Sequence, residues 1–244
     1  MDENKGMFEP INRRTLHWEI VRQFQEKIIS RQFKVGDKLP TERDIAAELN
    51  VNRATVREAL KKMEVLGLIE IRHGNGIYVK DYLESGNLEL FKEIIYMKDV
   101  VQIDVLRNIL DIRKIIVPVM AGLAAENRTG EELAELQQIV EDEQMPMLEK
   151  DLNVHHLVAR ASRNLFYLFI LNFFNQVFRD YGYLYFEVPE NRIRSKQFHN
   201  DILDAITRGD KSLADKITAD VLEYTEEAIY AYYRAVYGDE GGYS

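Results

Sequence analysis

The chain has 244 residues, of which 46% are hydrophobic and 30% charged, a balance typical of a folded protein with up to two domains. The absence of cysteine excludes disulfides, thiolate metal sites and cysteine nucleophiles. The formal net charge is −9, yet residues 1–80 carry 15 Lys and Arg against 12 Asp and Glu, whereas the remainder carries 17 against 29. A basic amino-terminal segment on an acidic body favours a nucleic-acid-facing module joined to a domain with another task.

No apolar run is long enough to cross a bilayer, and Met1–Pro10 lacks the pattern of a signal sequence. The sequence therefore predicts a cytoplasmic protein without a membrane partner. Breaks in the periodicity, among them a linker that contains Ser85 and Gly86, predict four regions. These are an amino-terminal domain over 1–80, a linker and linking helix over 81–98, an all-helical domain over 99–237, and a disordered tail over 238–244.

The first expected element is a helix over Thr15–Arg31, where apolar residues recur at helical spacing. The stretch from Leu39 to Val79 then predicts a short helix, a tight turn, a second helix and a two-stranded hairpin. Thr41 is the expected N-cap of the short helix, and Asn52 that of the second helix.

The second helix carries three cations at a spacing of four, Arg53, Arg57 and Lys61, which places them on one face. A compact helix pair that presents a basic helix is the build of a protein that reads the DNA major groove. The other interpretation of the cations alone is an ordinary solvated helix face. The residues expected to face inward are Ala54, Val56, Ala59, Leu60 and Met63.

The segments LIEIR and IYV alternate as strands around HGNG, a glycine-rich turn. We interpret this hairpin as a wing. Its tip, formed by His73, Gly74 and Asn75, is expected to enter a minor groove.

The whole stretch from Leu39 to Val79 resembles the winged-helix signature of the GntR family of bacterial transcription regulators. That signature combines a Leu-Pro-(Ser/Thr)-Glu-Arg start, a recognition helix rich in Val, Arg and Thr, and a His-Gly wing tip. The resemblance implies that operator DNA is contacted by Arg43, Asn52, Arg53, Thr55, Arg57, His73 and Gly74. Thr41, beside this set, and Asn75, at the wing tip, complete the expected contacts. The sequence departs from the family pattern at Ala54 and Asn75, which bears on the operator sequence and not on DNA binding itself.

Helical periods follow the linker, at about 88–97, 99–127, 130–144, 147–162, 165–186, 190–208 and 210–237. The predicted fold class is therefore mainly α, with an amino-terminal winged helix-turn-helix domain and a carboxy-terminal bundle of six to seven helices. The aromatic stretch NLFYLFILNFFNQVFRDYGYLYF is interpreted as bundle core or dimer interface, with a ligand-lining wall as the alternative.

Asp151 and His155 lie one helical turn apart on the same face, a spacing that suits two ligands of one divalent metal. The alternative is that these are ordinary core or surface groups. The body from Leu88 to Tyr237 also resembles the effector domain of the FadR subfamily of GntR regulators, called the FCD domain. Its metal-containing members use an aspartate and three histidines, and three of these positions correspond to Asp151, His155 and His199. The fourth position is Val221, so the implied metal set is incomplete.

A second likeness is to fatty-acid-responsive members of the subfamily, carried by Tyr185-Phe186-x-x-Pro189-Glu190-x-Arg192 and the preceding aromatic helix. Those regulators bind long-chain acyl-CoA in this bundle without a metal. Arg113 is the best candidate for a buried cation that faces a carboxylate, thioester or phosphate, and a structural salt bridge is the alternative. The expected effector pocket comprises Arg113, Asp151, His155 and His199.

The leading hypothesis is a transcription regulator that binds a palindromic operator as a homodimer. It is expected to act as a repressor, and no enzymatic activity is expected. A small effector, first of all a fatty acyl-CoA, would release or modulate it. One alternative keeps this fold but uses a metal-assisted site for an organic acid. Alternatives of other classes are a metal-dependent hydrolase at Asp151, His155 and His199, and an architectural protein that binds DNA by shape alone. No cofactor is certain from the sequence.

Overall fold

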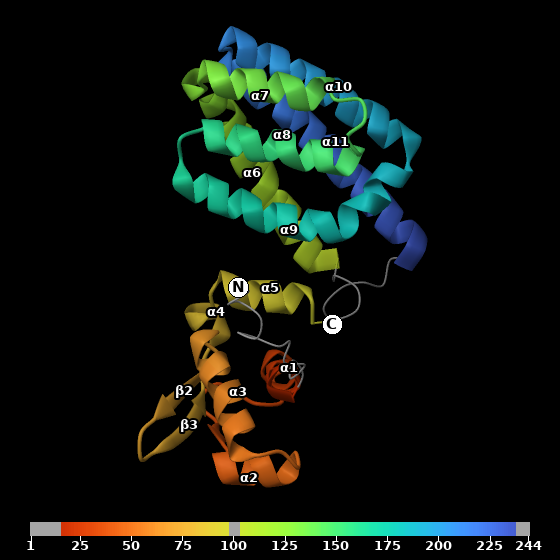
Figure 1. Ribbon diagram of the computed structural model, residues 1–244. Coiled ribbons are helices and arrows are strands. Elements are labelled where there is room, and N and C mark those ends of the chain that lie inside the picture. Colours follow the sequence, from red (N-terminus) through yellow and green to blue (C-terminus); the bar gives the residue numbers. More distant parts are fainter. Residues whose placement is uncertain (1–15, 98–102, 238–244) are drawn as a thin grey trace, which may run out of the picture. The chain divides into compact units, whose positions relative to one another are not determined.

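The computed structural model describes residues 16–97 and 103–237, and the chain divides into two compact units, Met1–Val101 and Gln102–Ser244 (Figure 1). The expected tail over 238–244 and the expected helix start at residue 99 lie outside the described residues. Among the helices that are described, none combines the length and the apolar character needed to cross a membrane.

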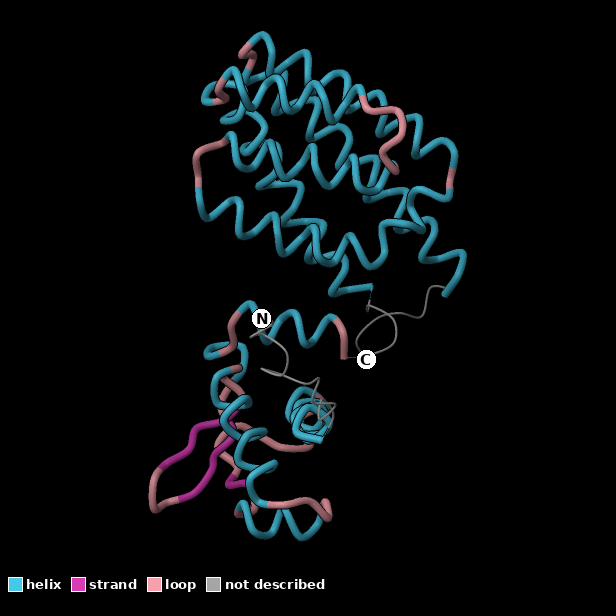
Figure 2. Tube along the Cα trace, viewed as in Figure 1, coloured by secondary structure: helices cyan, strands magenta, loops and turns pink. Residues whose placement is uncertain are grey.

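The first unit has the predicted order of helix, turn, helix and wing. Its strands form one antiparallel sheet in the order β1-β3-β2, and Figure 2 shows strands in this unit only. The elements are α1 (Leu16–Ile29), β1 (Lys38–Leu39), α2 (Glu42–Glu48), α3 (Arg53–Val65), β2 (Ile69–Arg72), β3 (Gly76–Val79), α4 (Tyr82–Ser85) and α5 (Leu88–Ile95).

Both predicted helix caps are confirmed. The Thr41 hydroxyl accepts a hydrogen bond from the backbone N–H of Asp44 at 3.3 Å and begins α2. The Asn52 side chain accepts from the backbone N–H of Thr55 at 2.8 Å and begins α3. Between them Asn50 adopts a positive φ of 51°, a conformation that asparagine tolerates better than most residues. These local bonds fix the turn that sets α3 against α2.

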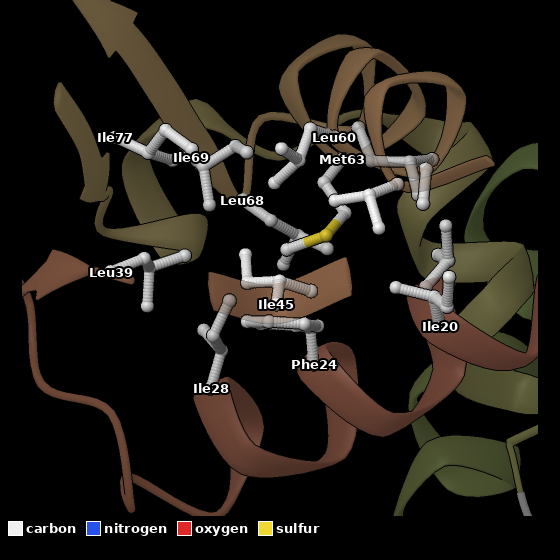
Figure 3. Packing of buried hydrophobic residues seen from close by; sticks show 14 of the residues in the cluster. Ile20, Phe24, Ile28, Leu39, Ile45, Leu60, Met63, Leu68, Ile69 and Ile77 are labelled. Carbon is white, nitrogen blue, oxygen red and sulfur yellow. The ribbon is translucent and has the colours of Figure 1, made fainter. Parts of the chain in front are cut away.

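One hydrophobic cluster holds the first unit together. It joins Phe24 and Ile28 of α1 to Leu60 and Met63 of α3 and to Ile77 of the sheet (Figure 3). Of the residues expected to face inward on α3, Val56, Ala59, Leu60 and Met63 are buried. Ala54 is exposed, so that expectation was wrong. It lies one residue after Arg53 in the first turn, on the solvent side of the helix.

Two short elements, β1 and α4, were not expected. Strand β1 pairs Leu39 with Ile77, which buries Leu39 and adds a third strand to the wing sheet. A two-residue strand has no alternating pattern for sequence analysis to detect. Helix α4 lies in the expected linker, whereas α5 corresponds to the expected helix over about 88–97, and its Leu90 belongs to the same buried cluster as α1 and α3. These helices are therefore part of the first unit's packing.

The second unit is all-helical over its described residues, as predicted. Helix α8 buries residues on most of its sides, among them Lys150 and Asp151. The expected helix over 130–144 ends three residues early, because Asp142 leaves the helix and accepts a hydrogen bond from the backbone of Gln144 at 2.8 Å. The helices are α6 (Ile103–Asn127), α7 (Gly130–Glu141), α8 (Met147–Ala161), α9 (Leu165–Glu187), α10 (Pro189–Arg208) and α11 (Lys211–Tyr237).

Candidate DNA-binding surface and effector pocket

Helix α3 presents the predicted cations on one side. Arg53 is its first residue, and Arg57 and Lys61 follow at intervals of four. All three are exposed, and an α-helix turns once every 3.6 residues, so they form a line along the helix. We call these three residues the basic row. Such a line can approach the phosphates and base edges of a major groove.

Asn52 and Thr55 lie beside the start of the basic row, but they also bind each other. The Asn52 side-chain oxygen accepts from the Thr55 backbone N–H at 2.8 Å and from the Thr55 hydroxyl at 3.1 Å. The carbonyl end of the Asn52 amide therefore serves the helix cap. Its NH₂ group is the donor that remains for a phosphate or a base edge.

Two further predicted contacts lie at the start of α2. Arg43 has 73% of its side chain exposed, with its Nε 3.5 Å from Asp44 Oδ1. The Thr41 hydroxyl donates to Asp44 Oδ2 at 2.6 Å while it caps the helix. Arg43 is thus the residue of this pair that presents a charge to solvent, whereas Thr41 chiefly stabilises α2.

An ion pair between α2 and α3 was missed by the sequence analysis. Arg57 Nη2 lies 3.0 Å from Glu42 Oε2, and Arg57 Nε lies 3.3 Å from both Glu42 oxygens. The hydrogen bond from Arg57 is the main reason that the pKa of Glu42 falls below its usual value. Glu42 and Arg57 are 15 positions apart in the sequence and lie on different helices, so no helical spacing indicates the pair.

The predicted wing tip is the turn between β2 and β3, where His73, Gly74 and Asn75 are all exposed. Tyr78 braces this turn, since its hydroxyl donates to the Asn75 side-chain oxygen at 2.9 Å. The guanidinium carbon of Arg72 lies 4.6 Å from the centre of the Tyr78 ring. Tyr78 was expected in a strand, but no local pattern indicates its contact with the wing tip.

In the second unit the four expected effector-pocket residues do come together. None of the four exposes more than 6% of its surface. They are Arg113 of α6, Asp151 and His155 of α8, and His199 of α10. His199 Nε2 lies 3.1 Å from Asp151 Oδ1, and His155 Nε2 lies 3.8 Å from Asp151 Oδ2. One carboxylate thus lies between two imidazoles, one on its own helix α8 and one on α10.

Burial sets the charge state of this cluster. It is the largest cause that lowers the pKa of His155 to about 4, so this imidazole is neutral near pH 7. Burial also lowers the pKa of Arg113, against the attraction of Asp151. For Asp151 burial acts to raise the pKa, but His155, the His199 hydrogen bond and Arg113 together bring it below the usual value. The pocket therefore contains a carboxylate and a guanidinium.

The cavity inside this cluster measures about 10 Å³, enough for roughly one water molecule. Two polar atoms of the cluster, Arg113 Nε and His199 Nδ1, have no hydrogen-bond partner among the described residues. Val221 lines the cavity with an apolar side chain and supplies no donor there. Residues 16–97 and 103–237 contain no group of three or more His, Asp or Glu side chains arranged to hold a metal. Asp151, His155 and His199 are thus not arranged as such a group in the described structure.

Comparison with known proteins connects both units to one group of regulators. Residues 16–79 match the model of the bacterial regulatory proteins of the gntR family, and residues 108–224 match that of the FCD domain. The chain is 28% identical over 229 residues to the HTH-type transcriptional regulator Mce2R of Mycobacterium tuberculosis, covering 91% of this chain and 95% of that protein. It is 29% identical over 187 residues to the fatty acid metabolism regulator protein of Shewanella sp. MR-4, covering 73% and 77%.

A solved structure of the Listeria monocytogenes protein Lar superposes with a TM-score of 0.55 at 17% identity, covering 91% of this chain and 99% of that one. This likeness concerns the fold alone. The two family models match the winged helix-turn-helix and the helical body in the order found here. The chain therefore belongs to the GntR family of bacterial DNA-binding transcription regulators and carries an FCD effector domain.

Proposed function

We propose that this regulator is a homodimeric repressor that binds a palindromic operator and leaves it when a small effector binds. The observation that carries the proposal is the exposed basic row of α3, offered by the same domain as the wing tip. One recognition helix contacts only a few base pairs, whereas two helices related by a two-fold axis read a palindrome. Family membership favours this role over the hydrolase and the shape-only binder.

An exposed apolar surface supports the dimer. Helices α6 and α9 contact each other, and each leaves large apolar side chains in solvent with 43–70% of their surface exposed. Large exposed apolar patches mark interaction sites. A second copy of the chain would cover it with the same residues about a two-fold axis. These residues are Ile112, Ile115 and Val119 of α6 and Leu165, Phe166 and Phe169 of α9.

For the effector, a fatty acyl-CoA is our first candidate. The support is the name of the Shewanella relative, together with a buried guanidinium whose Nε has no partner among the described residues. A cation in that position suits a carboxylate, thioester or phosphate oxygen. A cavity of about 10 Å³ cannot hold an acyl chain, so binding would require the surrounding helices to separate. That movement would link the effector to DNA affinity.

A short organic acid is the second candidate. It would use the same Arg113 cation but would need less expansion of the cavity. The two candidates therefore predict different ligands for one pocket. Both place the ligand in the expected effector pocket of Arg113, Asp151, His155 and His199.

Replacing Arg53 with alanine is expected to reduce operator affinity by about 1–3 kcal/mol and to relax the base preference at one position of each half-site. Arg53 is exposed at the first turn of α3, so the loss should come from DNA contacts and not from unfolding. Fluorescence anisotropy on a selected operator measures it. Arg208→Ala is the matched control, since Arg208 is an exposed arginine of α10 that pairs with Asp204. Equal affinities for the wild type and the Arg53→Ala variant would contradict the assignment of α3.

Saturating long-chain acyl-CoA is expected to lower operator affinity at least tenfold, within the range of ordinary allosteric coupling of about 1–3 kcal/mol. Coenzyme A without an acyl chain should leave it unchanged. The same titration with short organic acids tests the second candidate. Unchanged affinity with every acyl-CoA, alongside a decrease with an organic acid, would replace the first candidate with the second.

A further inference from the structure

We propose that Glu42 is a specificity-determining residue, which holds Arg57 in position to read a base and keeps that cation from acting as a general phosphate contact. The inference rests on the proposed DNA-binding function and deepens it. Glu42 itself is not required to touch DNA. It acts through Arg57 and is therefore a positioning residue.

The geometry of the pair fixes the guanidinium by one edge. Glu42 is the first residue of α2, and Arg57 lies on the second turn of α3. The carboxylate engages Nε and Nη2 at 3.0–3.3 Å. A guanidinium is planar, so this contact sets the orientation of the whole group. The adjacent edge, formed by Nη1 and the second N–H of Nη2, remains for two hydrogen bonds to guanine.

The charges around Glu42 explain why the pair also limits non-specific binding. The carboxylate is influenced by all three cations of the basic row, with Arg57 first and Arg53 and Lys61 as weaker contributions. It thus neutralises part of the row. Non-specific DNA binding depends on cations that replace the counterions of phosphates. An Arg57 that is already paired would have to leave Glu42, or bring a carboxylate toward the phosphates, to make such a contact.

A purely structural role for the pair predicts something different. Arg57 and Glu42 are 56% and 35% exposed at their side chains, and exposed ion pairs contribute at most about 1 kcal/mol to stability. If the pair only tied α2 to α3, its loss would weaken binding to every DNA sequence alike. A change in the ratio of operator affinity to non-specific affinity is the signature of positioning.

Glu42→Gln is the test, because the amide keeps the size of the side chain and removes its charge. We expect affinity for a scrambled DNA duplex to increase, with the plot of log K against log salt steeper by about 0.9 for the added phosphate contact. We expect operator affinity not to increase in parallel, because Arg57 loses its fixed orientation. The ratio of operator to scrambled affinity should fall about tenfold.

Glu58→Gln is the matched control. Glu58 lies on α3 and pairs with Lys61 of the same basic row at 3.0 Å, with 63% of its side chain exposed. Each substitution removes one negative charge beside the row. It should alter the salt dependence but preserve the specificity ratio. In a background of Arg57→Ala, Glu42→Gln should cause no further fall in the ratio.

Two results would overturn the inference: a specificity ratio unchanged by Glu42→Gln, or an equal fall of the ratio in the Arg57→Ala background. The wild-type protein separates this failure from failure of the proposed function. Absence of any preference for an operator over scrambled DNA would reject the function itself. A strong wild-type preference that Glu42→Gln leaves intact would reject only the role of Glu42.

Discussion

Gly67→Ala is expected to destabilise the DNA-binding unit by about 3 kcal/mol, the sum of a steric clash and an unfavourable backbone conformation. Gly67 follows α3 with a φ of +78°, in the left-handed region. An added Cβ would overlap the carbonyl oxygen of Ser85 and lie 2.7 Å from its carbonyl carbon. Because that obstacle is backbone, it cannot rotate away. The only tryptophan of the chain, Trp18, lies on α1 of this unit, so its fluorescence in urea follows the loss.

Gly74→Ala separates the two contributions. Gly74 also has a positive φ, of +73°, but a Cβ there would have no atom of the described structure within 4 Å. Its substitution should cost only the backbone contribution, about 1 kcal/mol. Equal losses for the two variants would mean that the contact between Gly67 and Ser85 is not tight and would contradict a close approach of α4 to the end of α3.

Asp151→Ala is expected to destabilise the effector domain by about 3–5 kcal/mol, the usual cost of removing one partner from a buried charge cluster. The variant would leave the buried Arg113 guanidinium without its nearby carboxylate and His199 Nε2 without its partner at 3.1 Å. The midpoint of urea unfolding, followed by far-ultraviolet circular dichroism, measures the change. Most of the helix signal comes from this domain.

The control for Asp151→Ala is the loss of an ion pair at the protein surface. Asp204 and Arg208 of α10 lie 2.7 Å apart with more than half of each side chain exposed, so Asp204→Ala should cost at most about 1 kcal/mol. Ligand binding offers a second readout, since an effector that contacts Arg113 should bind Asp151→Ala differently from Asp204→Ala. If the two variants unfold at the same urea concentration, Asp151 is not the balancing charge of a buried cluster.

Most of the fold was predictable because its signals are local. The helices of the second unit follow from apolar residues at helical spacing, and the caps at Thr41 and Asn52 follow from side chains that bind backbone groups three residues ahead. What could not be predicted depends on distant partners. Strand β1 exists because Leu39 meets Ile77, and Ala54 is exposed because the core is filled by residues on the other side of α3.

The candidate sites show the same division. The basic row is visible in the sequence as three cations at a spacing of four, and Asp151 with His155 as a pair one turn apart. The ion pair of Glu42 with Arg57 and the bond of Tyr78 to Asn75 arise only when the elements pack. Arg113 and His199 entered the predicted pocket by resemblance, and no spacing joins them to Asp151. The size of the cavity depends on the packing of all its walls.

Footprinting on DNA selected by the purified protein tests the central claim most directly. The predicted result is protection of one discrete palindrome, with two half-sites about one helical turn apart. Protection should be lost in the Arg53→Ala variant at concentrations where Arg208→Ala still protects. Uniform protection along the DNA, or an identical footprint from the Arg53→Ala variant, would contradict the account of α3 as the helix that reads the operator.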